Sequence, residues 1–300
     1  MAKRKNKKVT ANRNYKDTVF RKLFSDRRNL LSLYNAINGT AYTDETKLEI
    51  VTLENAIYMG MKNDLAFIID TNLFLYEHQS TYNPNMPLRD LFYISGEYQK
   101  LVDRKSLYSS ILLKLPAPNF IVFYNGKRKM PDKWTNCLSE SYENQQGEPN
   151  LELKVVTINI NRDCNRQLME QCRILGEYAQ YVEKVRENAE TMSLDTAVKE
   201  AVDECIQKGI LADFLRVNRA EVIAMSIFEY DKEEEEQKLQ ATYEKIGEKR
   251  GIQIGEKQGE LKKAKSIAIS LAQEGESVER IARILGETEK TIKEWLAETH

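Results

Sequence analysis

Two acidic residues and one amide flank two short apolar runs in the first third of the chain. Asp64 precedes the run Leu65–Ile69, and Glu77 and Gln79 follow the run Leu73–Tyr76. Uninterrupted apolar runs of this length favour strands buried on both faces, so the pair predicts a hairpin at the centre of a sheet. Two carboxylates on adjacent strands repel each other unless a cation lies between them, and Mg²⁺ prefers such oxygen ligands. The pattern therefore predicts a site for Mg²⁺ or another divalent cation, although it also fits a hairpin with solvated polar ends.

Strand alternation indicates which groups can share this site. Glu77 and Gln79 point to one face of the strand, whereas the His78 side chain points to the other, where we expect a packed, hydrogen-bonded histidine. The backbone carbonyl of His78 is a candidate third oxygen ligand beside Asp64 and Glu77. Asp17 is a further candidate, because it begins a predicted helix beside the sheet, but it equally suits the positive end of that helix. Two acids upstream of the motif, Glu49 and Glu54, are alternative third acids for the site. We rank both below Asp64 and Glu77.

One acid is followed, a dozen residues later, by a second acid, any residue and a polar residue. This order resembles the PD-(D/E)XK nuclease motif, with Asn63-Asp64 in place of Pro-Asp and Glu77-His78-Gln79 in place of Glu-x-Lys. Further segments resemble the Rpn family of recombination-promoting nucleases or putative transposases, over roughly the first two-thirds of the chain. These segments are EHQST at Glu77–Thr81, MPLR at Met86–Arg89 and Lys16-Asp17-x-x-Phe20-x-Lys22-x-Phe24. The resemblance implies a metal-dependent DNA endonuclease linked to recombination or transposition, with Asp64, Glu77 and Gln79 as catalytic residues. The family often has His before the acid that corresponds to Asp17, where this chain has Lys16.

Gln79 stands where related nucleases keep Lys. A Lys carries charge toward the scissile phosphate or helps to activate water, whereas Gln only donates and accepts hydrogen bonds. Because the family itself carries EHQ, the resemblance implies that Gln79 is a family trait. The exchange leaves weaker chemistry or a second cation that supplies the charge. Two alternatives remain open: a catalytically inactive DNA-binding or regulatory homologue, and an assembly protein that acts through its C-terminal helices.

The elements around the motif predict a mixed sheet flanked by helices. Lys16–Gly39 has the apolar spacing of an amphipathic helix, with a break near Ser25-Asp26. Leu88–Val102 carries Leu88, Leu91, Phe92, Ser95, Tyr98, Leu101 and Val102 on one stripe, which predicts a helix crossing the sheet. Because the buried strand Asn119–Tyr124 follows, strand, helix and strand form a parallel crossover. Further strands are predicted at Leu48–Val51 and Leu151–Ile160, and Asp132–Asn150 is expected to be irregular.

The fold class is therefore α/β, with a PD-(D/E)XK-like mixed central sheet flanked by helices, then a helical extension and a small C-terminal helical tail. The predicted segments are a basic flexible tail (1–14), the nuclease core (15–165), a helical extension of the core (166–230), a charged glycine-spaced helix or linker (231–265) and a helix-turn-helix-like tail (266–300). The extension includes a helix predicted at Ile210–Phe228. Glycine recurs at positions 247, 251, 255 and 259, which suits either a semi-flexible linker or a self-association segment. The tail suits a DNA-reading module or an assembly motif.

Basic residues gather in two places that suit phosphate contacts. The first 30 residues contain eleven Lys or Arg against two Asp, which is typical of a solvated tail that can also attract nucleic acid. Lys127, Arg128 and Lys129 follow a predicted strand in a loop, and with Lys16 they are the candidate DNA contacts. DNA is therefore the expected partner, with a homo-oligomer through the C-terminal helical region as a second expectation.

Composition bounds the class of protein. The chain has 300 residues, of which 41% are hydrophobic and 30% charged, enough for a substantial core and long exposed helices. We expect no membrane partner and a cytoplasmic location, because the sequence lacks a long apolar run and the apolar segment of a signal peptide. The four cysteines show no CxxC pairing and only two histidines could join them, so reduced thiols are expected in place of a zinc site.

Overall fold

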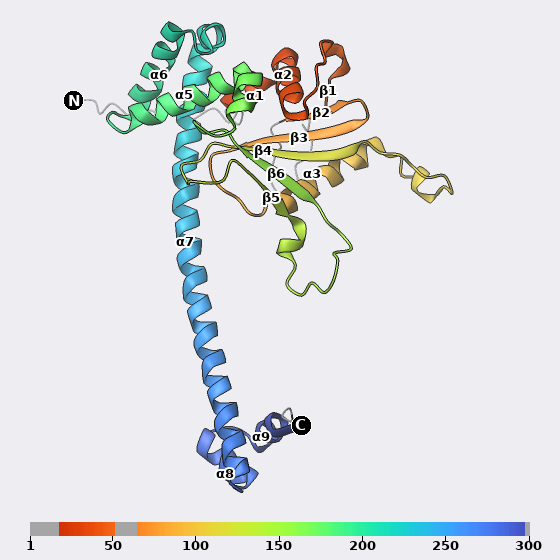
Figure 1. The fold of residues 1–300 in the computed structure, drawn as a ribbon, viewed down its shortest axis with the longest axis vertical. Helices are drawn as coiled ribbons and strands as arrows, with labels where there is room; N and C mark the ends of the chain where they lie inside the picture. The colour runs from red at the N-terminus through yellow and green to blue at the C-terminus, as the bar shows by residue number, and fades with distance from the viewer. Residues whose placement is uncertain (1–17, 52–64, 298–300) are drawn as a thin grey trace, which may run out of the picture. The chain divides into compact units, whose positions relative to one another are not determined.

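The computed structural model describes residues 18–51 and 65–297, and its fold is α/β with a mixed six-stranded sheet (Figure 1). The strands lie in the order β1-β2-β3-β4-β6-β5. Their bounds are β1 (Glu49–Ile50), β2 (Leu65–Ile69), β3 (Asn72–Gln79), β4 (Ala117–Tyr124), β5 (Lys133–Cys137) and β6 (Lys154–Asn159). Neighbours pair antiparallel from β1 to β3 and between β5 and β6, and parallel from β3 through β4 to β6.

The predicted hairpin is confirmed as β2 and β3, which pair from Leu65 opposite Tyr76 to Ile69 opposite Asn72. Its turn residues Asp70 and Thr71 have φ of 48° and 73°. Two consecutive left-handed residues match the twist of the flanking strands, so this tight turn fixes the register of the pair.

The predicted crossover is also confirmed: α3 (Met86–Leu101) connects β3 to its parallel neighbour β4. The face that α3 buries differs from the prediction. Leu88 and Phe92 are exposed, whereas Asp90, Tyr93 and Glu97 are buried. Of the predicted stripe, Leu91 and Tyr98 pack against the core. The prediction is wrong for Leu88, Phe92 and Leu101, because the helix turns Asp90 and Glu97 inward in their place. Between α3 and β4 the chain forms an extension that contains the short 3-10 helix η2 (Ser106–Tyr108).

Two apolar clusters cover the two faces of the sheet. One contains Phe74 and Tyr76 of β3 together with helices that precede and follow the sheet in the chain. The other contains Leu73 and Leu75 of β3 together with α3. Alternate β3 residues therefore face opposite layers, as strand geometry requires. It follows that Glu77 and Gln79 belong to the α3 face and His78 to the other.

The first predicted helix consists of two helices, α1 (Val19–Phe24) and α2 (Arg27–Asn38). The carboxylate of Asp26 caps α2 by accepting hydrogen bonds from two backbone amides of its first turn. Gly39 ends α2 with a left-handed φ of 64°. The break expected near Ser25 is therefore confirmed.

After the sheet the chain is helical, as predicted. The helices are α4 (Arg166–Gln171), α5 (Arg173–Ala189), α6 (Leu194–Lys208), α7 (Ala212–Gln273), α8 (Val278–Leu285) and α9 (Glu289–Ala297). The helix predicted at Ile210–Phe228 corresponds to the start of α7. Its predicted end at Phe228 is wrong, because α7 continues through the charged run and the glycine-spaced segment. Residues 1–234 and 235–300 form two compact units. In the second, Ile281 of α8 and Trp295 of α9 pack on Ala268 near the end of α7.

Two chemical expectations can be compared with the fold. All four cysteines are free, as expected from their spacing. Within the described ranges, none of the helices combines the length and the apolar character that a membrane crossing requires.

Candidate active site

Glu77 is a buried carboxylate near the C-terminal end of the central strand β3. Its residue is only 5% exposed, and it faces α3. A carboxylate at such a position requires a cation or strong hydrogen bonds, because burial of an uncompensated charge is costly. Arg89 provides one partner, since its Nη2 lies 2.6 Å from Glu77 Oε1.

Arg89 lies in the first turn of α3, close to the end of the helix where a cation is least favoured. The positive end of a helix dipole attracts anions and repels basic side chains. The carboxylate of Glu77 gains from both the dipole and the guanidinium, and Arg89 is held by Glu77 and by a hydrogen bond to Tyr93 Oη at 3.1 Å. This part of the molecule is therefore arranged around a negative group at position 77.

Gln79 extends the same face of β3. Its Nε2 donates to Glu77 Oε1 at 3.3 Å and lies 2.6 Å from the sulfur of Met86 at the start of α3. Gln79 and Glu77, both predicted catalytic residues, are therefore brought together. The amide supplies a hydrogen bond and no charge, so Arg89 supplies the positive charge beside Glu77.

The surroundings of the ion pair alter the pKa values of its neighbours. Burial raises the pKa of Asp90 well above its usual range, and the charge of Glu77 adds to this effect although Arg89 opposes it. Burial and Glu77 also raise the pKa of Tyr93 to about 12. Burial lowers the pKa of Arg89, but the attraction of Glu77, with smaller effects of its neighbours, leaves it raised. Burial thus favours the protonated form of Asp90, which lies beside the Glu77–Arg89 ion pair.

The His78 side chain lies on the opposite face of β3, as strand alternation predicts. Its ring stacks on Phe20 at a centroid distance of 5.2 Å, and its Nε2 is 3.1 Å from Tyr178 Oη. The backbone carbonyl has a different orientation. In the ladder to β4, the Gln79 carbonyl accepts from the amide of Asn125 at 3.0 Å, and carbonyls alternate along a strand, so the His78 carbonyl points to the other edge of β3.

Several predicted site residues lie outside the described residues: Asp64, Asp17, Lys16 and Glu54. Glu49 is exposed on the edge strand β1 and is separated from β3 by β2, so the fold does not bring it to Glu77. Within residues 18–51 and 65–297, no group of three or more His, Cys, Asp or Glu side chains is arranged to hold a metal ion. The described groups that suit a divalent cation are the Glu77 carboxylate and the His78 carbonyl, both hard oxygen donors.

The basic loop Lys127–Lys129 follows β4 at the edge of the sheet where β3 ends. Gln79 is paired with Tyr124, the last residue of β4. A Cβ on Gly126 would lie 2.2 Å from the backbone oxygen of Ser80, so glycine is required where the loop passes the end of β3. All three basic residues of the loop are exposed. The loop thus lies at the same end of the sheet as Glu77 and Gln79.

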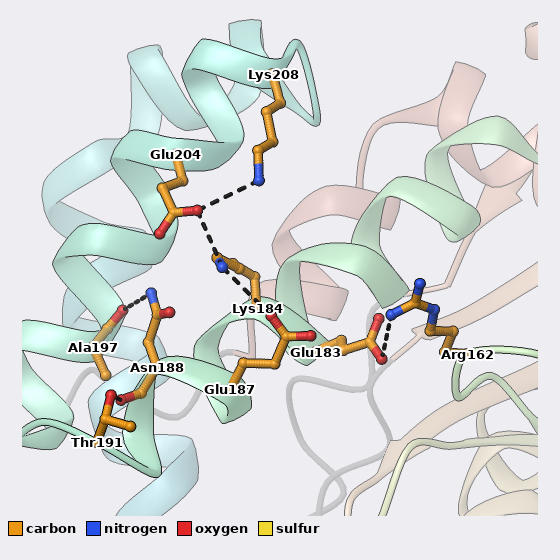
Figure 2. A network of polar contacts seen from close by, with 9 residues as sticks. All are labelled: Arg162, Glu183, Lys184, Glu187, Asn188, Thr191, Ala197, Glu204 and Lys208. Carbon is orange, nitrogen blue, oxygen red and sulfur yellow. Dashed lines mark hydrogen bonds and ion pairs between the residues drawn. The ribbon is translucent and has the colours of Figure 1, made fainter.

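A second polar cluster lies in the helical extension (Figure 2). Its residues also line a cavity of about 500 Å³. Lys184 of α5 contacts Glu204 of α6 at 3.1 Å and Glu187 at 3.4 Å, and Lys208 contacts Glu204 at 3.4 Å. A hydrogen bond to Lys184 lowers the pKa of Glu204. Because these charges compensate one another across two helices, we interpret the cluster as an α5–α6 contact and not as a reactive site.

Arg89 was not predicted as a site residue and appears in the sequence pattern only as part of the MPLR segment. A basic residue in the first turn of a helix is electrostatically unfavourable, but α2 also begins with Arg27 and Arg28, so this signal alone does not single out Arg89.

Comparison of this chain with family models, with curated proteins and with solved structures finds no match.

Proposed function

We propose that the chain is a divalent-metal-dependent DNA endonuclease that hydrolyses phosphodiester bonds, linked to recombination or transposition and acting in the cytoplasm. One observation carries the proposal: the buried carboxylate of Glu77 shares the α3 face of β3 with the Gln79 amide and the Arg89 guanidinium. A carboxylate, a guanidinium and an amide donor gathered in a buried position are chemically suited to bind an anion or a metal ion.

The topology supports the same proposal. An N-terminal helical segment precedes the antiparallel strands β1, β2 and β3, after which α3 crosses to the parallel strand β4. The PD-(D/E)XK core, as the resemblance implies it, has this succession of helix, hairpin, helix and strand. In that arrangement Glu77 and Gln79 occupy the positions of the motif acid and the polar residue that follows it.

In the proposed site, Asp64, Glu77 and the His78 carbonyl would hold the cation, with Asp17 as a further candidate. A bound Mg²⁺ supplies Lewis acidity and a more acidic water. Glu77 provides the negative charge that selects a cation over a neutral ligand. Gln79, which already donates toward Glu77, orients that carboxylate and hydrogen-bonds to water or phosphate oxygen.

Arg89 supplies the positive charge that the neutral Gln79 lacks. Its side chain is 23% exposed, so the guanidinium reaches both Glu77 and the solvent side of the site. A guanidinium binds phosphate oxygens in a bidentate manner and stays protonated at every working pH. We assign to Arg89 the stabilisation of the negative charge that develops on the phosphate. Lys127, Arg128 and Lys129, with Lys16, attract the DNA backbone through contacts that do not read sequence.

A second candidate function is an inactive DNA-binding or regulatory homologue. The Glu77–Arg89 contact favours it, because the guanidinium already neutralises the carboxylate that a metal would need. This candidate predicts DNA affinity that decreases steeply with salt, since phosphate contacts release counterions, without cleavage.

Plasmid nicking by the full chain tests the proposal directly. We expect Mg²⁺-dependent nicking that Asp64→Ala and Glu77→Ala abolish, each assayed at a temperature at which circular dichroism shows the variant folded, because loss of Glu77 also lowers the stability of the fold. Glu97→Gln is the matched control, because Glu97 is a buried acid of α3 paired with Lys100 at 2.7 Å outside the candidate site. Nicking that survives both Ala variants contradicts the assignment of Asp64 and Glu77.

Metal binding provides a readout that does not depend on cleavage. We expect Mn²⁺, followed by electron paramagnetic resonance, to bind the wild-type chain and to bind Glu77→Ala at least about tenfold more weakly. Binding without nicking in a panel of supercoiled, linear and branched DNA substrates supports the regulatory candidate. Failure of folded wild-type protein both to bind Mn²⁺ and to nick plasmid rejects the endonuclease.

A further inference from the structure

An exposed apolar extension connects α3 to β4. We call residues 103–116 the apolar arm, and its most exposed large side chains are Leu107 (64%), Tyr108 (93%), Ile111 (74%) and Leu112 (83%). Figure 1 shows the arm reaching away from the sheet. Side chains of this kind are found mostly in cores or interfaces, so their concentration in one extension indicates a contact surface.

The arm has a defined local structure. Backbone amides in η2 and next to it donate to Asp103, Lys105 and Ser106, and the Ile111 amide donates to Ser109 Oγ at 3.1 Å. At its base, Tyr98 Oη of α3 donates to the Pro116 carbonyl at 2.8 Å. The arm is therefore a shaped projection fixed to the end of α3, which lowers the entropy cost of binding.

A second apolar surface lies on the outer side of α3. We call Leu88, Phe92, Ser95 and Gln99 the α3 stripe, because their spacing of three and four residues places them on one side of the helix. Leu88 is 39% and Phe92 45% exposed, and all four residues are uncharged. A helix face that points to solvent normally carries charges, so the α3 stripe also resembles an interface.

We propose that the arm of one chain binds the α3 stripe of a second copy of the same chain. Leu88 precedes the end of α3 by thirteen residues, which corresponds to about 20 Å along the helix. An antiparallel pair of α3 helices related by a two-fold axis brings each arm to the other copy's stripe. Such an isologous contact is closed and satisfies both surfaces at once.

The exposed area suits a dimer. Leu113 and Leu115 extend the arm, and the arm and the stripe together expose on the order of 1,000 Å², taking about 200 Å² for each complete residue. A standard interface buries about 800 Å² on each partner, whereas the largest apolar patch on a typical monomer is about 300–600 Å². The surfaces are therefore large enough for stable self-association.

Charge near the arm raises one competing occupant, an anionic lipid surface. Arg104, Lys105 and Lys114 flank the apolar side chains, a combination that also suits peripheral membrane binding. A membrane would cover the arm and leave the α3 stripe in water. A second copy covers both, which is why the observations favour it. This inference does not depend on the proposed chemistry.

Sedimentation velocity over a concentration series tests the dimer with the full chain. We expect Tyr108→Ser/Leu112→Ser in the arm and Phe92→Ser in the stripe each to weaken association at least about tenfold, as for interface anchors. Circular dichroism is expected to stay unchanged, because these side chains are exposed. Val217→Ser on α7 is the matched control, since Val217 is 83% exposed but lies outside both surfaces. Association that responds equally to all the variants contradicts the proposal.

A mixture of the variants sharpens the test. The arm variant and the stripe variant each lack both contacts as homodimers, but their heterodimer keeps one intact arm on one intact stripe. We therefore expect mixing to restore part of the association. A photo-crosslinking residue at position 108, with one copy isotopically labelled, should crosslink to α3 of the other copy. Crosslinks only to residues 235–300 of the other copy, a monomer at all concentrations, or a monomer that binds anionic vesicles through the arm would each overturn the proposal.

Discussion

Arg89 of α3 lies with its Nη2 2.6 Å from Oε1 of Glu77 in β3, and this ion pair joins the first turn of the crossover helix to the central strand. The side chains of the acid and of the base are 7% and 23% exposed. Removal of one partner from a buried pair leaves the other charge without compensation. The pair is therefore a structural requirement as well as the centre of the candidate site.

Arg89→Met is expected to lower the free energy of unfolding by about 3 kcal/mol, the lower end for a broken buried pair, because water still reaches the guanidinium. Urea titration followed by circular dichroism measures the change. Arg216→Met is the control, since Arg216 and Asp213 form an exposed pair at 3.2 Å that is expected to contribute about 0–1 kcal/mol. Equal effects of the two substitutions would show that Arg89 is not a buried counter-ion.

Asp90 gives a pH-dependent prediction. Burial raises its pKa, with a further contribution from Glu77, so the folded state keeps the proton to higher pH than the unfolded chain does. The stability that this proton confers is complete below the unfolded pKa of about 3.9 and is lost as pH rises toward the folded pKa. Asp90→Asn removes this loss, so the variant should gain stability relative to wild type as the pH rises above about 4. Unfolding titrations across that range test the trend, with exposed Asp103→Asn as control; parallel curves for Asp90→Asn and wild type would contradict it.

Substitutions at His78 and at its partner Tyr178 distinguish a packing role of the imidazole from a catalytic role. Its ring stacks on Phe20 and contacts Tyr178 Oη at 3.1 Å, on the face of β3 opposite Glu77. Tyr178→Phe is therefore expected to cost about 1 kcal/mol of stability through the lost hydrogen bond. His78→Gln should likewise destabilise the fold, yet keep the proposed Mg²⁺-dependent nicking of plasmid. Loss of nicking in folded His78→Gln with full stability would assign the imidazole to the chemistry.

The hairpin and the crossover could be predicted because their signals are local. The apolar runs of β2 and β3 are bounded by polar turn residues, and Asp26 is a typical helix cap at the predicted break. These features depend on a few adjacent residues and on the backbone preferences of those residues. The positions of Glu77 and Gln79 on one face follow from strand alternation alone.

The inner face of α3 could not be predicted from apolar periodicity. The helix begins at Met86 and buries Asp90 and Glu97, whereas Leu88 and Phe92 remain exposed. Polar residues are tolerated inside when partners from other elements compensate them, and those partners are not visible in a local pattern. Leu88 and Phe92, in turn, have helical apolar spacing although they lie at the surface, because spacing alone does not show which side of a helix faces the sheet.

The strand β5 was missed for a related reason. It lies within the segment that was expected to be irregular, and its residues Lys133–Cys137 alternate between exposed and partly or fully buried positions at the edge of the sheet. Edge strands bury little and carry polar residues, so their hydrophobic signal is weak. Pairing with β6 fixes β5, and its partners, from Lys154 opposite Cys137 to Ile158 opposite Lys133, lie too far along the chain to give a local signal.

The glycines of α7 yield the last prediction. Gly247, Gly251, Gly255 and Gly259 lie in a helix, and a Cβ added at each would meet nothing within 4 Å. Replacement of each by Ala should therefore stabilise the helix by about 1 kcal/mol, because Ala loses less backbone entropy on folding. Circular dichroism and amide hydrogen exchange should show higher helicity and slower exchange. Gly209→Ala is the control with opposite sign, since Gly209 ends α6 at a φ of 76° that Ala rarely adopts. Loss of helicity in the four Ala variants would contradict a continuous helix through this segment. Weaker self-association together with higher helicity would instead identify the glycine face as a contact between copies.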